Sequence, residues 1–284
     1  MSIRSARAED RDAVARFSEH TWEWGDYIPM VWEYWLSEPK GKLLVVTVDR
    51  EPVGIAHVVM VAPGEAWLEG LRVAPEYRRA GLATKLTQRC LAEATKLGVS
   101  VVRFATAATN EPVRRIAARL GFVRVASMLT RQAEAGPDGS AGFKHPTLPD
   151  MHYLVDFLRD SPVLAAMGGL CNTGWRFQRL TPQMLKDRVN QGMVLMLGRP
   201  DNISALAITG TGYPGGLLVS FADGQPEALR TLVRGLRAEA AGYEPPQVTV
   251  WLPEMETMQQ LFVEAGFEPL MESPLWVYEV GAKA

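Results

Sequence analysis

Two short sequence patterns occur twice in this chain, in the same order and at nearly the same spacing. Gly70-Leu71-Arg72-Val73 corresponds to Gly216-Leu217-Leu218-Val219, and Leu120-Gly121-Phe122 corresponds to Ala265-Gly266-Phe267. Gly70 and Gly121 are 51 residues apart, and Gly216 and Gly266 are 50 apart. Such a recurrence is typical of a duplicated structural unit. We expect two similarly folded halves; the alternative is that the second half is an unrelated α/β domain.

Strand and helix patterns alternate in both halves, which predicts an α/β (α+β) fold with a twisted mixed sheet flanked by helices in each half. In the first half we expect strands at 42–49, 52–62, 66–73, 100–106 and 122–128, and helices at 7–20, 26–36, 82–94 and 111–120. In the second half we expect helices at 183–191, 226–240 and 256–267, and strands at 193–198, 203–210, 215–221, 247–252 and 275–280.

A long stretch interrupted by glycine and proline lies between the halves. The segment 134–150 holds three residues of each, and such a run interrupts both helix and strand. We therefore expect a first domain at 1–133, a linker at 134–149 and a second domain at 150–284.

Composition excludes several classes of protein. A net charge of −2 excludes a basic field over the whole chain for nucleic acid, although a local patch stays open. Cys90 and Cys171 alone cannot form a disulfide framework or a four-cysteine zinc site. The charged N-terminus does not resemble a signal peptide, and the sequence contains no apolar run of about 20 residues. We expect a cytoplasmic protein that has no membrane or nucleic-acid partner and binds no metal.

The segment 69–86 reads as a strand, a turn and a helix, with Arg78, Arg79 and Gly81 in the turn. The start of a helix leaves backbone N–H groups unpaired and carries partial positive charge, which suits phosphate oxygens. Arginines add charge-assisted donors, and glycine allows close approach of the backbone. An ordinary strand-to-helix turn with solvated arginines is the alternative.

The flanks of this turn resemble a known superfamily. Arg78-x-x-Gly81-x-Ala83, preceded by a strand and Val-Ala-Pro-Glu-Tyr, is similar to the acetyl-CoA signature of the GNAT acetyltransferases. Asn110, followed by a helix ending in Leu120-Gly121-Phe122, resembles the next block of that superfamily, and the resemblance covers about residues 3–130. It implies a sheet splayed between the strands at 66–73 and 100–106, with acetyl-CoA lying in the gap. The residues that it assigns to this cosubstrate are Leu71, Arg72, Val73, Arg78, Arg79, Ala80, Gly81, Leu82, Ala83, Thr84, Asn110 and Arg114.

Glu69 is the candidate catalytic base. Strand alternation places it on an apolar face with Trp67, Leu71 and Val73, where a carboxylate either takes part in catalysis or forms a structural ion pair. An amine must lose a proton to attack a thioester, and a nearby carboxylate can accept it. In many GNAT enzymes a tyrosine protonates the leaving thiolate, but the corresponding residue here is Ala117. Because Cys90 lies on an apolar helix stripe, we expect direct attack without an acyl-enzyme.

An aromatic and acidic segment lies between the first two helices, where GNAT proteins build the acceptor pocket. Its candidate substrate-binding residues are Trp22, Glu23, Trp24, Asp26 and Tyr27. Aromatic rings can enclose a cation, and carboxylates attract an ammonium group. A hydrophobic contact between helices with two solvated acids is the alternative. Residues 67–86 are also similar to the vertebrate histidine N-acetyltransferase type, which implies a free amino acid or a similar small amine as acceptor.

The second half lacks the phosphate-binding residues. The position of Gly81 corresponds to Glu227, and Asp223 lies nearby. Both acids would repel phosphate, so the second half is expected to be a degenerate GNAT-like copy. The sequence as a whole predicts an acetyl-CoA-dependent N-acetyltransferase that acts on a small amine. The alternatives are a CoA-binding regulatory module without turnover and a protein or peptide N-acetyltransferase.

Overall fold

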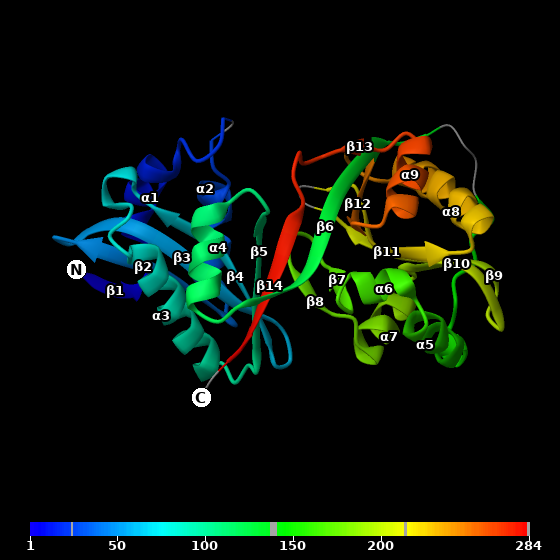
Figure 1. Ribbon diagram of the computed structural model, residues 1–284, viewed down its shortest axis with the longest axis horizontal. Helices are drawn as coiled ribbons and strands as arrows, with labels where there is room; N and C mark the ends of the chain where they lie inside the picture. Colours follow the sequence, from blue (N-terminus) through cyan, green and yellow to red (C-terminus); the bar gives the residue numbers. More distant parts are fainter. Residues whose placement is uncertain (24, 137–140, 213–214, 283–284) are drawn as a thin grey trace. The chain divides into compact units, whose positions relative to one another are not determined.

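The computed structural model describes residues 1–23, 25–136, 141–212 and 215–282, and Figure 1 labels their helices and strands. These residues divide into two units. Unit 1 comprises Met1–Ala105, Asn110–Val123 and Tyr278–Ala284, and unit 2 comprises Thr106–Thr109 and Arg124–Val277. Each unit is therefore built from separate segments of the chain, and the last residues of the sequence contribute to unit 1.

The sheet of unit 1 is covered by helices on both faces. Strand β2 contains five consecutive buried residues, 43–47, as expected when neither face is open to water. Leu44 and Val46 pack with helix α3, whereas Leu43 and Val45 pack with helices α1 and α2. The strands lie in the order β1 (Ser2–Ser5), β2 (Gly41–Val48), β3 (Glu51–Ala62), β4 (Glu65–Val73) and β5 (Val101–Ala107), antiparallel except for the parallel pair β4–β5.

The helices of unit 1 follow their apolar stripes. Leu82, Leu86, Cys90 and Ala94 are all buried, which confirms the predicted stripe of α3. The helix expected at 7–20 is divided in two, because the Asp10 carboxylate accepts hydrogen bonds from the Arg7 N–H and from Arg4 and ends a short 3₁₀ turn there. The elements are η1 (Ala8–Asp10), α1 (Arg11–Ser18), α2 (Ile28–Ser37), η2 (Pro75–Tyr77), α3 (Leu82–Lys96) and α4 (Glu111–Arg119).

Unit 2 also contains parallel and antiparallel strands flanked by helices. Its main strands lie in the order β6 (Val123–Glu134), β12 (Gln247–Pro253), β11 (Leu217–Gly224), β10 (Asn202–Thr211) and β9 (Val194–Arg199), with β13 (Glu268–Pro269) beside β6. Its helices are α5 (Met151–Arg159), α6 (Pro162–Ala166), α7 (Pro182–Asn190), α8 (Pro226–Glu239) and α9 (Glu256–Glu264), and β7 (Leu170–Asn172) pairs with β8 (Phe177–Arg179). Short 3₁₀ turns occur at η3 (Leu148–Asp150) and η4 (Ala240–Gly242), and β14 (Leu275–Gly281) is the last strand in the sequence.

The two units repeat the same central arrangement. In unit 1 the parallel strands β4 and β5 are paired over three residues only, and in unit 2 the parallel strands β11 and β12 are also paired over three. The duplicated glycines Gly121 and Gly266 both follow a helix with a left-handed backbone, at φ +79° and +80°, which is how glycine ends a helix. The predicted fold class, a mixed sheet flanked by helices in each of two tandem copies, is confirmed.

The segment expected to be a linker packs in its described parts with unit 2. Glu134 is the last residue of β6, Gly136 donates its N–H to the carbonyl of Arg237, and Lys144 forms a bridge with Met196 of β9. Residues 137–140 of the expected linker lie outside the described residues. The predicted domains, 1–133 and 150–284, describe two copies of one fold, whereas the two units are defined by the contacts between residues. The domain bounds therefore stay a prediction.

A buried arginine joins the end of the chain to unit 1. Arg103 of β5 is 1% exposed, and its guanidinium binds Glu65 of β4 and, at 2.7 Å, Glu279 of β14. A buried guanidinium that loses a carboxylate partner keeps its desolvation cost without the compensating attraction. The ion pairs of Arg103 therefore hold the last strand of the sequence in this unit.

We expect Glu279→Ala to lower the free energy of unfolding by about 1–3 kcal/mol, because Arg103 would retain only part of its buried compensation. Urea unfolding followed by circular dichroism measures the change. Glu33→Ala, at an exposed position of α2, is the matched control, with an expected change below about 0.5 kcal/mol. Equal losses in the two variants would show that the Arg103–Glu279 ion pair contributes nothing specific.

Candidate active site

Strand β4 carries a β-bulge at the centre of the candidate site. Glu69 lies opposite His57 and Arg72 lies opposite Ile55, so the two residues Gly70 and Leu71 face a single residue of β3. Gly70 has a φ of +68°, and a Cβ on it would lie 2.5 Å from the ring of Trp35. Glycine is therefore required here both for the left-handed backbone and for the close approach of the ring.

The bulge changes which side chains share a face of the sheet. Residues directly opposite each other on paired strands point to the same side, so Glu69 and Arg72 lie on the face of His57 and Ile55, toward α2. Leu71 and Val73 pack instead with the cluster under α3. Strict alternation placed Leu71 and Val73 beside Glu69; that prediction is wrong, because the extra residue of the bulge reverses the alternation after position 70.

Glu69 is held by a histidine that the sequence analysis missed. The Nδ1 of His57 lies 2.9 Å from Oε1 of Glu69, and the His57 ring is fully buried and stacked on Trp35 at 4.7 Å between centroids. The Glu69 side chain is 14% exposed, so it lies at the edge of the buried layer. A plain count back from the turn at Pro63–Gly64 would put position 57 opposite position 70. An irregularity between Met60 and Ala62 shifts the register by one residue and brings His57 opposite Glu69, so the count alone could not have identified the pair.

The acceptor segment forms a second cluster on the same face. Arg72 donates from Nε to Oδ2 of Asp26 at 2.7 Å, and its guanidinium carbon lies 5.8 Å from the ring centre of Trp22 and 5.4 Å from that of Tyr27. The Asp26 side chain is fully buried, and its Oδ1 accepts the N–H of Ile28 at the start of α2. Asp26 therefore compensates Arg72 and orders the entry into α2.

Tyr27 is half-buried beside these charges. Burial raises the pKa of Tyr27 to about 12, opposed by Arg72 and reinforced by the carboxylates of Glu69 and Asp26. The phenol is therefore neutral at physiological pH. Its ring meets Trp35 edge to face at 5.9 Å between centroids, so Tyr27 and His57 both contact the same indole.

The remaining acceptor candidates lie further out. Trp22 is 49% exposed and Glu23 is exposed. Trp24 lies outside the described residues. The structure thus brings Asp26, Tyr27 and Trp22 together around Arg72, whereas Glu23 is on the surface; the substrate-binding role of these residues stays a prediction.

The turn before α3 presents its backbone to solvent. Residues Arg78 to Gly81 are exposed, Arg79 and Gly81 have φ values of +66° and +75°, and a Cβ on Gly81 would meet no atom within 4 Å. Gly81 is the N-cap residue of α3, so the N–H groups of the following first turn have no acceptor within the helix. Space, unpaired donors and arginines therefore coincide at the positions predicted to hold a diphosphate.

The neighbouring elements match the predicted splay. The ladder between β4 and β5 ends at the pair Trp67–Arg103, before the bulge. Asn110 is the N-cap residue of α4, where its side chain accepts the N–H of Val113 at 3.4 Å, and Arg114 is half-buried one turn later. Ala117 is fully buried against the sheet and carries no group that could donate a proton.

Neither thiol is set up as a nucleophile. Cys90 and Cys171 are fully buried, and burial raises the pKa of each thiol to about 12. The thiolate is the reactive form of cysteine, so both side chains are inert at neutral pH. Within the described ranges, there is no group of three or more His, Cys, Asp or Glu residues arranged to hold a metal ion.

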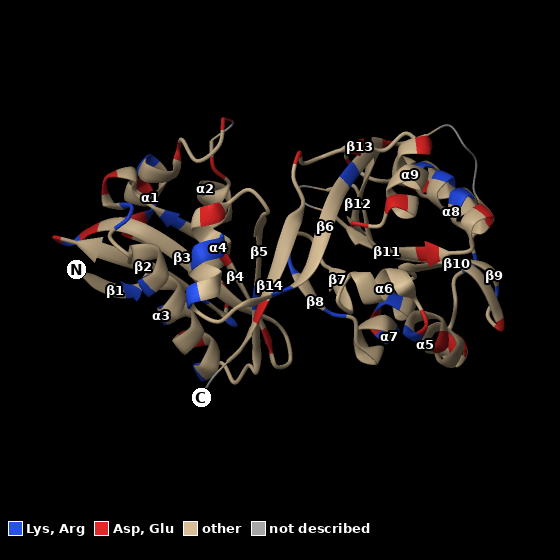
Figure 2. Cartoon of the chain, viewed as in Figure 1, with Lys and Arg blue, Asp and Glu red and all other residues tan. Residues whose placement is uncertain are grey.

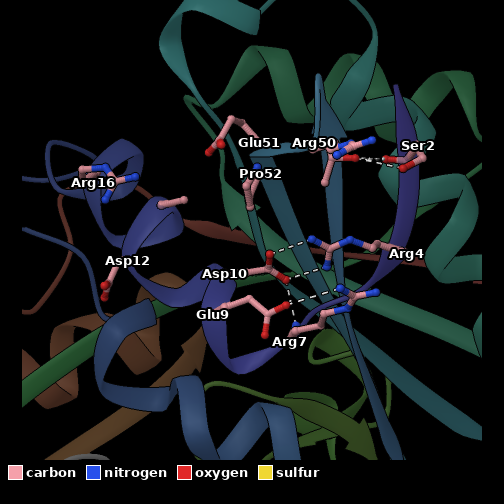
Figure 3. A pocket seen from close by; sticks show the side chains of 12 residues that line it. Ser2, Arg4, Arg7, Glu9, Asp10, Asp12, Arg16, Arg50, Glu51 and Pro52 are labelled. Carbon is pink, nitrogen blue, oxygen red and sulfur yellow. Dashed lines mark hydrogen bonds and ion pairs between the residues drawn. The ribbon is translucent and has the colours of Figure 1, made fainter.

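A pocket of about 540 Å³ lies elsewhere in unit 1, between β1, the first helix and the β2–β3 turn (Figure 3). Four of its charged residues form two ion pairs: Arg4 binds Asp10 at 2.6 Å and Arg7 binds Glu9 at 3.4 Å. Burial alone would raise the pKa of Asp10, but hydrogen bonds from Arg4 and Arg7 outweigh it and hold that pKa below its usual value. Among the described residues, none that was predicted for the active site lines this pocket.

Comparison with known proteins supports the resemblance read from the sequence. Residues 11–122 match the model of the acetyltransferase (GNAT) family. This confirms the predicted GNAT resemblance, and the matched residues contain the bulged strand, the exposed turn and Asn110.

The sequence is also similar to histidine N-acetyltransferases of two fishes. It is 31% identical over 86 residues to the enzyme of Scomber australasicus and 32% identical over 86 residues to that of Oreochromis niloticus. The match covers 30% of this chain and 26% of each relative, so the chain spans about a quarter of the length of these relatives.

Two solved structures share the fold over nearly the whole chain. One is a GCN5-related N-acetyltransferase from Sphaerobacter thermophilus, with a TM-score of 0.62, 14% identity, and coverage of 100% of this chain and 96% of that one. The other is a tandem GNAT protein from the clavulanic acid biosynthesis pathway, with a TM-score of 0.57, 15% identity, and coverage of 100% and 99%. The tandem arrangement expected from the duplicated patterns is thereby confirmed at the level of the fold.

The bulge provides a test of the site's construction. Gly70→Ala is expected to lower the free energy of unfolding by about 2 kcal/mol or more, since a left-handed alanine costs about 1–2 kcal/mol and its Cβ would collide with Trp35. Gly98→Ala is the matched control, because Gly98 has a similar φ of +74° but open space at its Cβ. Urea unfolding compares them; equal losses would mean that contact with Trp35 adds nothing.

Proposed function

We propose that unit 1 catalyses acetyl-CoA-dependent N-acetylation of a small amine, with Glu69 as the general base. The observation that supports this most is the placement of Glu69 on a bulged strand next to the β4–β5 splay, in a unit whose exposed turn leads into the N-terminus of α3. The GNAT family match over residues 11–122 gives the same class of reaction.

The exposed turn fits a diphosphate. Backbone N–H groups from Ala80 to Thr84 lie at or near a helix start, where partial positive charge favours anions. Arg78 and Arg79 add charged donors that are exposed to solvent. By the same resemblance, the backbone of Leu71 and Val73, the side chain of Asn110 and the nearby Arg114 would hold the pantetheine arm. Arg72 was also assigned to the cosubstrate, but its pairing with Asp26 favours a role on the acceptor side.

The chemistry needs one base and no covalent enzyme intermediate. Bound acetyl-CoA supplies an acetyl thioester. The neutral acceptor amine attacks its carbonyl carbon, the new C–N bond forms, and the C–S bond breaks to release the thiolate. Glu69 accepts the proton that the amine nitrogen loses. The thiolate takes a proton from water, because a thiol with a pKa of about 8.5 leaves without a dedicated acid and Ala117 cannot provide one.

The acceptor side favours a small amine, with a free amino acid as one candidate. Aromatic rings and charges surround Arg72 on the face that carries Glu69, and the partial similarity to histidine N-acetyltransferases points the same way. The alternative of a CoA-binding module without turnover is favoured by Ala117 in place of the usual tyrosine. A protein or peptide amine is the remaining alternative as acceptor.

Unit 2 is proposed to have no role in binding CoA. Only Gln225 separates β11 from α8, whereas eight residues separate β4 from α3. The first residue of α8 is Pro226, which has no N–H, and Glu227 follows in the first turn. Basic positions along α8 lie between acidic positions near its two ends (Figure 2), and Arg230 pairs with Glu227. This helix start is therefore unsuited to a diphosphate.

Among the described residues no helix is long and apolar enough to cross a membrane.

Glu69→Gln is expected to lower kcat by about 10²- to 10⁴-fold, because the amine loses its proton acceptor. Free thiol released from acetyl-CoA, measured with a panel of amino acids, other small amines and peptides, reports the rate. CoA affinity should change by less than about twofold, since position 69 is outside the turn. Glu51→Gln, exposed at the start of β3, is the control and should keep the wild-type rate. Unchanged kcat in Glu69→Gln would remove Glu69 from the mechanism.

Arg79→Ala is expected to weaken CoA binding by about tenfold, or about 1.4 kcal/mol, through loss of a charged phosphate contact. Arginine and alanine both carry a Cβ, so the cost of the left-handed backbone at position 79 is similar in the two proteins. Calorimetry should show no loss for pantetheine, which lacks the diphosphate. Arg89→Ala is the control, because Arg89 lies in α3, the helix that follows the turn, and is paired with Glu93. Equal weakening of CoA and pantetheine would contradict a phosphate contact.

A further inference from the structure

His57 is fixed on three sides. Its Nδ1 lies 2.9 Å from Oε1 of Glu69, its ring is stacked on Trp35 at an interplanar angle of 16°, and a Cβ on Gly41 would lie 2.7 Å from its Nε2. The ring is fully buried. A polar side chain this buried normally satisfies both ring nitrogens, yet Nε2 has no hydrogen-bond partner in the described structure.

The orphaned Nε2 determines the protonation of the ring. If Nε2 carried a hydrogen, a buried donor would lack an acceptor, and in the doubly protonated form that donor would belong to a buried cation. With the hydrogen on Nδ1, the ring donates to the Glu69 carboxylate, and only a lone pair on Nε2 is left unpaired. The geometry therefore favours a neutral imidazole with its hydrogen on Nδ1.

We propose that His57 is the positioning residue for the catalytic base: as the neutral Nδ1–H tautomer, it donates to Glu69 and holds that carboxylate in one orientation beside the acceptor site. This inference rests on the proposed acetyltransferase function. The stacked Trp35 fixes the plane of the imidazole, and the same indole packs against Gly70 at the bulge. One aromatic ring thus sets both the path of β4 and the direction of the side chain that precedes the bulge.

The hydrogen bond leaves Glu69 able to act as a base. A carboxylate has about four lone-pair sites, and His57 uses one of them. During turnover the amine proton moves to Glu69 and then to water, while the hydrogen on Nδ1 of His57 stays in place. His57 therefore neither gains nor loses a proton over the cycle, which distinguishes positioning from proton relay.

Other titratable groups lie near the Glu69–His57 pair. Tyr27, from the N-terminal end of α2, is neutral because burial raises its pKa to about 12, and Arg72 on β4 is paired with Asp26. Glu38, after the end of α2, lies near the other edge of the imidazole, since a Cβ on Gly41 would be 2.7 Å from both Glu38 Cγ and His57 Nε2. Glu38→Gln is therefore the control for the pH profile, and a change that only the His57 variant shows reports on the Glu69–His57 pair.

The first experiment compares His57→Leu with His57→Asn. Leucine removes the donor at similar volume, whereas asparagine can place an amide N–H near the former Nδ1. We expect His57→Leu to lower kcat by about 10- to 100-fold with little change in the acceptor KM, because a base misplaced by about 1 Å costs about that much. Its acidic limb of kcat/KM should move up by about one pH unit, since a carboxylate without its donor binds its proton more tightly. His57→Asn should recover most of kcat and of the pH profile.

Three outcomes separate the failure of this inference from the failure of the proposed function. Wild-type rate and pH profile in a folded His57→Leu, with Glu69→Gln inactive, would overturn the positioning role and leave the function standing. A folded His57→Asn as slow as His57→Leu would also overturn it. A wild-type protein that releases no thiol with any amine would overturn both.

The second experiment does not depend on activity or on a folded leucine variant. Nitrogen-15 NMR of the wild-type protein distinguishes histidine tautomers, and His57→Asn assigns the His57 signals among the four histidines of the chain. We expect a protonated Nδ1 and an unprotonated Nε2 at neutral pH. A ring protonated at Nε2, or at both nitrogens, would overturn the assignment.

Discussion

The contact between Gly70 and the indole of Trp35 is the constraint on which the candidate site depends. Because glycine has no Cβ, β4 can bulge at this position against the indole. The bulge puts Glu69 and Arg72 on one face of the sheet, while Leu71 and Val73 pack under α3. The same interruption coincides with the end of the β4–β5 ladder, where the two strands separate. Backbone geometry at a single glycine thus arranges both the polar face that we propose for the acceptor and the separation of strands that we propose for the cosubstrate.

The charges of unit 1 are divided between structure and proposed chemistry. Arg103 is buried, is paired with Glu65 and Glu279, and serves the framework. Arg72 is paired with Asp26 on the face that we propose for the acceptor. The arginines of the turn before α3 are exposed instead. Unit 2 has kept the sheet but has lost this turn, because α8 follows β11 almost directly and begins with proline. The two copies thus share the fold, whereas among the described residues the exposed arginine turn before a helix start, which we propose to bind a diphosphate, belongs to unit 1.

Much of the fold could be predicted because periodicity and glycine position are local signals. The stripe of α3, the helix-ending glycines and the order of strands in the sheet regions belong to this class, as does the turn around Gly81. The segment 151–179 was not assigned, since its short helices and two three-residue strands are too brief for a clear period. Leu71 and Val73 were assigned to the wrong face of the sheet because strand periodicity does not reveal the bulge at Gly70. That bulge packs against Trp35, a residue distant in sequence. His57 was missed for the same reason: its partner is set by strand register. The roles of the site residues stay predictions.

The route of the chain also constrains how the protein can be made. Glu279, which pairs with Arg103, belongs to the same unit as Glu69, although most of the polypeptide lies between Glu69 and Glu279. During synthesis on the ribosome, residues 1–123 emerge long before the strand that satisfies Arg103. The last strand that contributes to unit 1 is translated only after unit 2. Unit 1 can therefore complete its fold only when translation of unit 2 has finished.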